Sequence, residues 1–133
     1  SPVFKQAMVR ELITNTVADF KSHYAELKAD QSLSRVFVLF MAGTDPDTGD
    51  SWCPDCRNAE PHIEAAVKGL GDDVAFLAVD VGDRPGWKSP DCPFRHLDEA
   101  KVTGVPTLFE IKSGRELNGD DCQDGAKVAA FFA

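Results

Sequence analysis

Two cysteines, Cys53 and Cys56, are separated by two residues in the segment Trp-Cys-Pro-Asp-Cys at residues 52–56. Thiols at this spacing can close into a disulfide and reopen. If Cys53 begins a helix, unpaired backbone N–H groups and the helix dipole stabilise its thiolate, which is then a nucleophile near neutral pH. Cys56, one turn later, is placed to attack the mixed disulfide that Cys53 forms. The pattern predicts dithiol–disulfide exchange, with Cys53 as the more exposed nucleophile and Cys56 as the resolving thiol.

Two other interpretations of this pair stay open. A cysteine such as Cys53 can be buried and inert, although such a thiol rarely precedes a helix with a partner three residues on. Two cysteines at this spacing also form half of a structural zinc site. The other half would have to come from scattered residues, namely Cys92, Cys122, His62 or His96. None of these belongs to a second paired motif, so we expect no bound metal.

The composition is that of an acidic globular protein. The chain has 133 residues, 43% of them hydrophobic, which suits a single domain over residues 1–133. Its 22 acidic and 14 basic residues give a net charge of −8, which repels nucleic acid and anionic lipid and favours partners with basic patches. The sequence shows neither a bilayer-spanning apolar run nor a signal peptide. Four cysteines are few for a disulfide-stapled secreted domain. We expect a cytoplasmic monomer that binds neither nucleic acid nor membrane.

Hydrophobic patterning predicts the elements that position the dithiol. The apolar run at residues 36–41 predicts a strand buried on both faces, and turn-forming residues at 43–51 predict a loop after it. A helix follows the dithiol to about residue 70, and a second central strand covers residues 74–79. The cysteine pair is therefore expected at the junction of a buried strand, a polar loop and a helix.

The rest of the chain supplies the outer elements. The predicted strands are residues 8–13, 107–111 and 115–117, the last two joined by a hairpin turn. The predicted helices are residues 16–29, 94–100 and 126–132, and residues 82–93 are predicted as loop. Strands that alternate with helices and end in a hairpin predict an α/β fold, with a central mixed β-sheet flanked by helices on both faces.

This order of elements, the Trp-Cys-x-x-Cys segment at the second helix and Val105-Pro106-Thr107 before the hairpin together resemble the thioredoxin fold. One branch is more similar still, the 14-kDa thioredoxin-related protein family. The similarity rests on the long loop at 42–51, on Trp-Cys-Pro-Asp-Cys, on Ala-Glu-Pro at 59–61 and on residues 81–88. Ordinary thioredoxins have Gly-Pro between the cysteines and a shorter loop. The resemblance covers nearly the whole chain from about residue 8.

The resemblance implies a cytosolic disulfide reductase with no bound cofactor, recharged by thioredoxin reductase with electrons from NADPH. Its implied substrates are cystine, other small disulfides, nitrosylated or persulfidated thiols, and selected proteins. The resemblance also implies that Pro106 follows a cis peptide bond, which turns the Val105 backbone outward to pair with an extended substrate. On sequence alone, a trans turn proline is the commoner state.

Three residues around the cysteines are expected to tune them. Trp52 flanks the mouth of the site, or alternatively packs beneath the loop. Pro54 and Asp55 lie between the cysteines, where the Asp55 charge by itself raises a cysteine pKa and the helix dipole opposes it. Glu60 is a candidate proton relay to Cys56, and an ordinary solvent-facing helical glutamate is the alternative.

The chain departs from ordinary thioredoxins at the proton acceptor. Those proteins bury an aspartate on the strand before the dithiol to deprotonate the resolving thiol, and the best aligned position here is Leu39. Water or a carboxylate of the 43–51 loop is the expected substitute.

We expect Cys92 to be an exposed, incidental thiol, with a regulatory or dimer-forming role as the alternative, and Cys122 to be structural.

Two further functions are compatible with the sequence. The thioredoxin scaffold can serve as a redox-gated adaptor or binding module, because one fold hosts many roles. A secreted disulfide former or isomerase is the third possibility, and it needs a signal sequence that this chain does not show. Retention of both cysteines with Trp52 and Pro106 favours the disulfide reductase.

Overall fold

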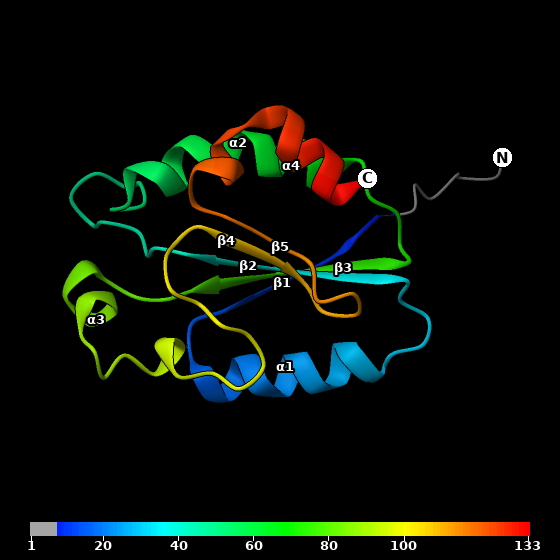
Figure 1. The fold of residues 1–133 in the computed structure, drawn as a ribbon, viewed down its shortest axis with the longest axis horizontal. Coiled ribbons are helices and arrows are strands. Elements are labelled where there is room, and N and C mark those ends of the chain that lie inside the picture. The colour runs from blue at the N-terminus through cyan, green and yellow to red at the C-terminus, as the bar shows by residue number, and fades with distance from the viewer. Residues whose placement is uncertain (1–7) are drawn as a thin grey trace, which may run out of the picture.

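The structure, a computed structural model, describes residues 8–133. A five-stranded mixed sheet, with strand order β1-β3-β2-β4-β5, forms its centre (Figure 1). The strands are β1 (Arg10–Thr14), β2 (Arg35–Met41), β3 (Val74–Asp80), β4 (Thr107–Glu110) and β5 (Glu116–Asn118). Strands β1, β2 and β3 run parallel, whereas β4 is antiparallel to both β2 and β5. The predicted mixed sheet with a terminal hairpin is confirmed.

Helices cover the two faces of the sheet. Figure 1 shows α1 (Val17–Ala29) below the sheet and α2 (Pro54–Lys68) and α4 (Gly125–Phe132) above it. The short helix α3 (Arg84–Lys88) lies near the same end of the sheet as the start of α2. Two 3-10 turns, η1 (Pro93–Arg95) and η2 (Gly119–Gln123), complete the elements.

Strand β2 explains why the sheet needs both helical layers. Its successive side chains point to opposite faces, as strand geometry requires. Val36, Val38 and Phe40 pack in the core on the α1 side, and Phe37 and Leu39 pack in the core on the α2 and α4 side. All five are buried. The prediction of a strand buried on both faces is confirmed, and the end of this strand delivers the chain to the dithiol.

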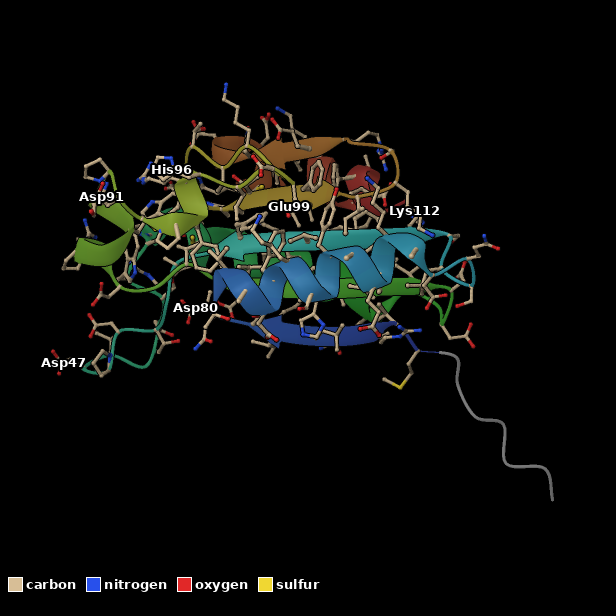
Figure 2. All side chains as sticks on the ribbon, turned by 90° about the horizontal axis from the view of Figure 1, so that it is seen from below. Asp47, Asp80, Asp91, His96, Glu99 and Lys112 are labelled. Atoms are coloured by element: carbon tan, nitrogen blue, oxygen red, sulfur yellow. The ribbon has the colours of Figure 1, made fainter. Side chains whose placement is uncertain are left out.

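The long loop before α2 is held in place by backbone contacts. Thr44 pairs with Ser51 across its base, and the amide of Asp45 donates to the carbonyl of Asp50 at 2.7 Å. Gly43 lies so close to the neighbouring loop that a Cβ added there would be 2.9 Å from the carbonyl oxygen of Gly82. The base of the loop is thus fixed, while Asp47 at its tip is exposed (Figure 2).

Two expectations downstream of β3 are wrong. The segment predicted as loop at 82–93 contains α3, because the Asp83 carboxylate caps the amide of Gly86 at 2.8 Å and Trp87 is buried against the core. The helix predicted at 94–100 is absent, and only η1 forms there. The guanidinium of Arg95 instead stacks on Trp87, 3.9 Å from the ring centroid, and ties η1 to α3.

Cys92 is also placed differently from the prediction. Its residue is only 6% exposed and packs in the α1-side core with Trp87 and Phe94. The expectation of an exposed thiol, drawn from its Pro- and Asp-rich neighbours, is wrong because α3 and η1 fold that segment against the core. Cys122 is fully buried in the other core, as expected for a structural cysteine.

Candidate active site

Cys53 is the residue at which the loop ends and α2 begins. It is the N-cap of α2, in an extended conformation, and Pro54 occupies the first turn of the helix. The Cys53 Sγ accepts a hydrogen bond from the backbone amide of Cys56 at 3.3 Å. Its sulfur therefore satisfies a helix N-terminal N–H group that is otherwise without a partner, which is the placement predicted for a nucleophilic thiolate.

The two cysteines lie together in a small apolar cluster with Ala42. Both are free thiols. Cys53 is 7% exposed and Cys56 is 1% exposed, so Cys53 is the more accessible of the pair, as predicted. Both residues are buried, and the small accessible fraction of the pair belongs mainly to Cys53.

The segment around Pro106 lies against the nucleophile. The Sγ of Cys53 is 3.7 Å from the carbonyl oxygen of Val105, and the Val105–Pro106 peptide bond is cis, as the resemblance implied. Pro106 is buried and Val105 is half-buried. The hydroxyl of Thr107 donates to the Gly104 carbonyl at 2.7 Å and holds the turn in place. A substrate that reaches Cys53 therefore meets the Val105 backbone as well.

Trp52 both flanks the site and packs beneath the loop, the two positions that the sequence suggested for it. Its indole N–H donates to the carbonyl of Gly82 at 2.8 Å, and its ring packs against both the dithiol cluster and the α1-side core. The guanidinium of Arg84 lies 5.0 Å from the centroid of the same ring and donates to the Trp52 carbonyl at 3.2 Å. Trp52 thus flanks Cys53 and also anchors the loop.

The remaining predicted residues are exposed on α2. Pro54 and Asp55 are exposed in the first turn of α2. Glu60 is also exposed, and it lines a hollow of about 240 Å³ whose walls include Ala42 and Ser51. The structure brings Trp52 and the Val105–Pro106 segment to the dithiol, whereas Glu60 lines this hollow, to which neither cysteine contributes.

The Cys56 thiol is held in its neutral form. Burial raises the pKa of Cys56 to about 12, and the neighbouring Cys53 adds to the rise. The Ala42 backbone and the Ser51 side chain act on this pKa in the opposite direction. Leu39 is buried in the core between the sheet and α2, so the strand before the dithiol offers no carboxylate at this position.

Sequence reasoning missed three residues at the site: Ser51, Arg57 and Arg84. Arg57 follows Cys56 on α2 and donates to the Ser51 carbonyl at 2.6 Å. Arg84 belongs to the segment at 81–88 that was noted only for its resemblance. Within that segment, Asp-Arg-Pro at residues 83–85 is typical of a capped helix start, which is the sequence signal that could have indicated α3.

No metal site is evident in the described part of the chain. Within residues 8–133, no three His, Cys, Asp or Glu side chains gather as ligands of one ion would. In the 43–51 loop, the Asp45 carboxylate accepts a hydrogen bond from the backbone amide of Asp47 at 2.9 Å.

Comparison with known proteins identifies the family. Residues 13–133 match the family described as thioredoxin domain-containing protein 17-like, thioredoxin domain. The chain belongs to this family. A thioredoxin-like protein Clot of Oryza sativa subsp. japonica is 39% identical over 133 residues, which cover 92% of this chain and 96% of that protein. Thioredoxin domain-containing protein 17 of Mus musculus is 37% identical over 98 residues, or 74% and 77% of the two chains.

Solved structures confirm the thioredoxin fold. Thioredoxin O2 from Arabidopsis thaliana, in its oxidised state, superposes with a TM-score of 0.59 at 21% identity and covers 96% of this chain and 95% of that one. The reduced thioredoxin pre-protein of Schistosoma mansoni gives a TM-score of 0.56 at 19% identity, covering 92% and 95%.

Membership of the thioredoxin domain-containing protein 17-like family makes the protein a thiol–disulfide oxidoreductase in general terms, and thioredoxin-family proteins act on disulfides. As for membranes, none of the helices within residues 8–133 combines the length and the apolar character that a bilayer crossing requires.

Proposed function

We propose that the protein is a cytosolic disulfide reductase in which Cys53 attacks substrate and Cys56 resolves the intermediate. One observation carries the proposal: the Cys53 sulfur caps α2, accepts the Cys56 amide at 3.3 Å and faces the Val105 carbonyl at 3.7 Å. This arrangement gives a nucleophile, a resolving thiol one turn away, and a backbone strip for the substrate.

The first step is attack by Cys53. Its thiolate attacks one sulfur of the substrate disulfide, a Cys53–substrate disulfide forms, and the other substrate sulfur leaves as a thiolate that takes up a proton. The Val105 backbone pairs with the extended substrate beside the new bond. The Cys56 amide stabilises the sulfur charge before the attack, because hydrogen bonds to the charged form favour it.

The second step is attack by Cys56 on the Cys53 sulfur. The Cys53–substrate bond breaks, the second substrate thiol is released, and a Cys53–Cys56 disulfide remains. The neutral Cys56 must lose its proton for this step, and its position one helical turn from Cys53 holds it close to its target.

We further propose that thioredoxin reductase restores the dithiol with electrons from NADPH, and that the protein works as a single-domain monomer without a bound cofactor. The substrates proposed are cystine, other small disulfides, nitrosylated or persulfidated thiols, and selected proteins. The long loop at 43–51, pinned at its base by the Thr44–Ser51 pairing, supports a narrower range than that of a thioredoxin with a short loop.

The test is an NADPH-coupled assay with thioredoxin reductase, using cystine and a disulfide-bonded protein as separate substrates. The wild type is compared with Cys53→Ser and with Cys92→Ser, a matched change at a buried cysteine outside the site. We expect turnover by the wild type and by Cys92→Ser, and none by Cys53→Ser. If the wild type consumes no NADPH above the reductase blank on any disulfide, the protein is not a reductase of this kind.

Two outcomes would select the alternatives. Full cellular activity of Cys53→Ser would favour a redox-gated adaptor, because an adaptor needs the surface and not the chemistry. A reduction potential near about −120 mV would indicate a disulfide former, whereas a reductase is expected near the thioredoxin value of about −270 mV.

A further inference from the structure

Ser51 is a buried hydroxyl beside the dithiol that the reaction as described does not use. Its residue is 7% exposed, and its Oγ donates to the Ala42 carbonyl at 3.1 Å and accepts from the Cys53 amide at 3.3 Å. Its backbone is fixed on two further sides, by the pairing with Thr44 and by the Arg57 guanidinium at its carbonyl. The hydroxyl therefore makes two hydrogen bonds of its own, and two backbone contacts fix the residue that carries it.

The two residues that bond to the Ser51 hydroxyl also pack with Cys56. Ala42 and Cys53, which share the Ser51 hydroxyl, are the two residues that form the apolar cluster with Cys56. Cys56 itself is almost fully buried, so water has little direct access to its sulfur. The side chains near it that can donate a hydrogen bond are consequently of special importance for forming a thiolate there.

We propose that the Ser51 hydroxyl is the hydrogen-bond donor that stabilises the Cys56 thiolate during resolution, in place of a buried carboxylate. The inference rests on the proposed function of Cys56 as the resolving thiol. Before resolution, the hydroxyl donates to the Ala42 carbonyl. As Cys56 ionises, rotation about the Cβ–Oγ bond moves that hydrogen onto the sulfur, while the oxygen keeps its bond from the Cys53 amide.

The step balances without any added reactant. Cys56 loses a proton, its sulfur attacks Cys53, and the electron pair of the Cys53–substrate bond leaves with the substrate sulfur. That substrate thiolate takes up one proton from solvent, equal to the proton that Cys56 released. Ser51 keeps its own proton throughout, so it acts as a donor of a hydrogen bond and not as a base.

Two other features support this role. The Ser51 side chain lowers the pKa of Cys56 against the larger effect of burial. In addition, Ser51 and Ala42, the residues joined by the hydroxyl, line a hollow that also reaches Glu60 and Asp80, so the Ser51 side of the site borders a cavity. Leu39 leaves no carboxylate on the preceding strand to perform the same task.

The decisive experiment measures the Cys56 pKa directly, by NMR of ¹³Cβ-labelled cysteine in a Cys53→Ser background. Cys53→Ser and Cys53→Ser/Ser51→Ala are titrated side by side. We expect the Cys56 titration of the second variant to lie at higher pH, with a thiolate fraction more than about twofold smaller at the same pH. Cys122, buried outside the site, serves as the internal control for folding and is expected to titrate identically in both.

A shift of less than about 0.3 units at Cys56, with Cys122 unchanged, would overturn the proposal, because one lost hydrogen bond to a thiolate predicts more. Ser51→Thr keeps the hydroxyl and is expected to restore the Cys56 pKa. A folded Ser51→Thr protein whose Cys56 titrates like that of Ser51→Ala would equally contradict the role of the hydroxyl.

The kinetic arm uses proteins with both active-site cysteines and an aromatic disulfide that releases a coloured thiol at each step. The first release reports Cys53 attack and the second reports Cys56 resolution. We expect Ser51→Ala to slow the second release about tenfold and the first less than about twofold. Thr48→Ala, which removes a hydroxyl contact to the Asp50 amide in the same loop, is the matched control and is expected to change neither.

This design separates the two hypotheses. Failure of the proposed function appears as a wild type without NADPH-dependent turnover. Failure of the Ser51 inference appears as an unchanged second release and an unchanged Cys56 pKa in a protein that turns over normally. A Ser51→Ala protein slowed equally in both releases would show a general distortion of the site and would also contradict the inference.

Discussion

A buried ionisable group lies near each end of strand β2, and the pKa values of the two groups are shifted in directions that favour opposite charge states. Beyond the last residue of β2 lies Cys56, whose burial raises its pKa. Beside the first residues of β2 lies Glu110. Burial raises the pKa of Glu110 as well, but hydrogen bonds from backbone amides together lower it by more than burial raises it, so the net pKa is lowered. In Figure 2, Lys112 marks the Glu110 end of the sheet and Asp80 marks the dithiol end.

The difference lies in the number of donors. The Glu110 carboxylate accepts backbone N–H groups of Val36, Lys112 and Ser113, at 2.9, 3.0 and 2.8 Å. It is a brace between β2 and the turn after β4 that is ionised at neutral pH. Cys56 has fewer donors and a neighbouring sulfur, and its pKa is raised. The Glu110 charge stabilises the fold at one end of β2, whereas the neutral thiol at the other end must lose its proton before it can act in the proposed reaction.

The largest expected effect is at the dithiol end. Cys56→Ser is expected to reduce NADPH-coupled turnover at least about a thousandfold, because the mixed disulfide forms and cannot be resolved. Mass spectrometry should detect the covalent substrate adduct on Cys53. Glu110→Gln, assayed as folded protein, is expected to keep turnover within about twofold. Loss of turnover in Glu110→Gln would mean that the two ends of β2 are coupled.

The second effect is on stability at the other end. Glu110→Gln replaces an acceptor oxygen by a donor group that faces three amides, and we expect it to lower the free energy of unfolding by about 2–3 kcal/mol. Urea denaturation followed by circular dichroism measures the change. Glu116→Gln, at an exposed position of β5, is the matched control and is expected to stay within about 0.5 kcal/mol. Equal changes in the free energy of unfolding for the two variants would show that Glu110 does not stabilise the fold in this way.

The same carboxylate predicts a pH dependence. The folded pKa of Glu110 lies below its usual value of 4.5, so the stabilisation is complete above that pH. It is lost as the pH falls from there through the lower folded pKa, because the folded protein must then protonate the brace. The unfolding free energies of wild type and Glu110→Gln are therefore expected to converge below about pH 4.5. A gap that stays constant down to pH 3 would contradict this assignment.

Much of this comparison could be predicted from the sequence. The apolar run of β2, the cysteine spacing and the α2 pattern predict the dithiol end, because periodicity and helix capping are local signals. Glu110 in the hairpin strand gives no local sign of its role, since its three donors come from two separate segments. Ser51 was missed for a similar reason: its hydroxyl matters only because Ala42 and Cys53 converge on it.

The errors have the same origin. Cys92 and the segment at 82–93 are rich in Pro, Gly and Asp, which predicts an exposed loop. Their burial depends on Trp87 reaching the α1-side core and on Arg95 stacking on that ring. The burial of such a segment depends on single side chains whose partners are distant in the sequence. The local composition of the segment does not contain that information.

The smallest expected effect concerns Glu60, the predicted proton relay. Glu60 is exposed and shares the hollow with Ser51. If water in the hollow takes the Cys56 proton, Glu60→Gln should slow the second thiol release only about twofold, far below the hundredfold typical of a positioned general base. Glu64→Gln, one turn further along α2, is the matched control and is expected to have no effect.

The pH profile of the second release gives the sharper readout. With water as acceptor, the rate of wild type and Glu60→Gln should rise in parallel with pH, because both depend only on the Cys56 thiolate fraction. A hundredfold loss in Glu60→Gln, together with a new inflection near the pKa of a carboxylate, would make Glu60 the base. Both ends of β2 would then have a carboxylate with a role. The two carboxylates would differ in their exposure to solvent, because Glu60 is exposed and Glu110 is buried.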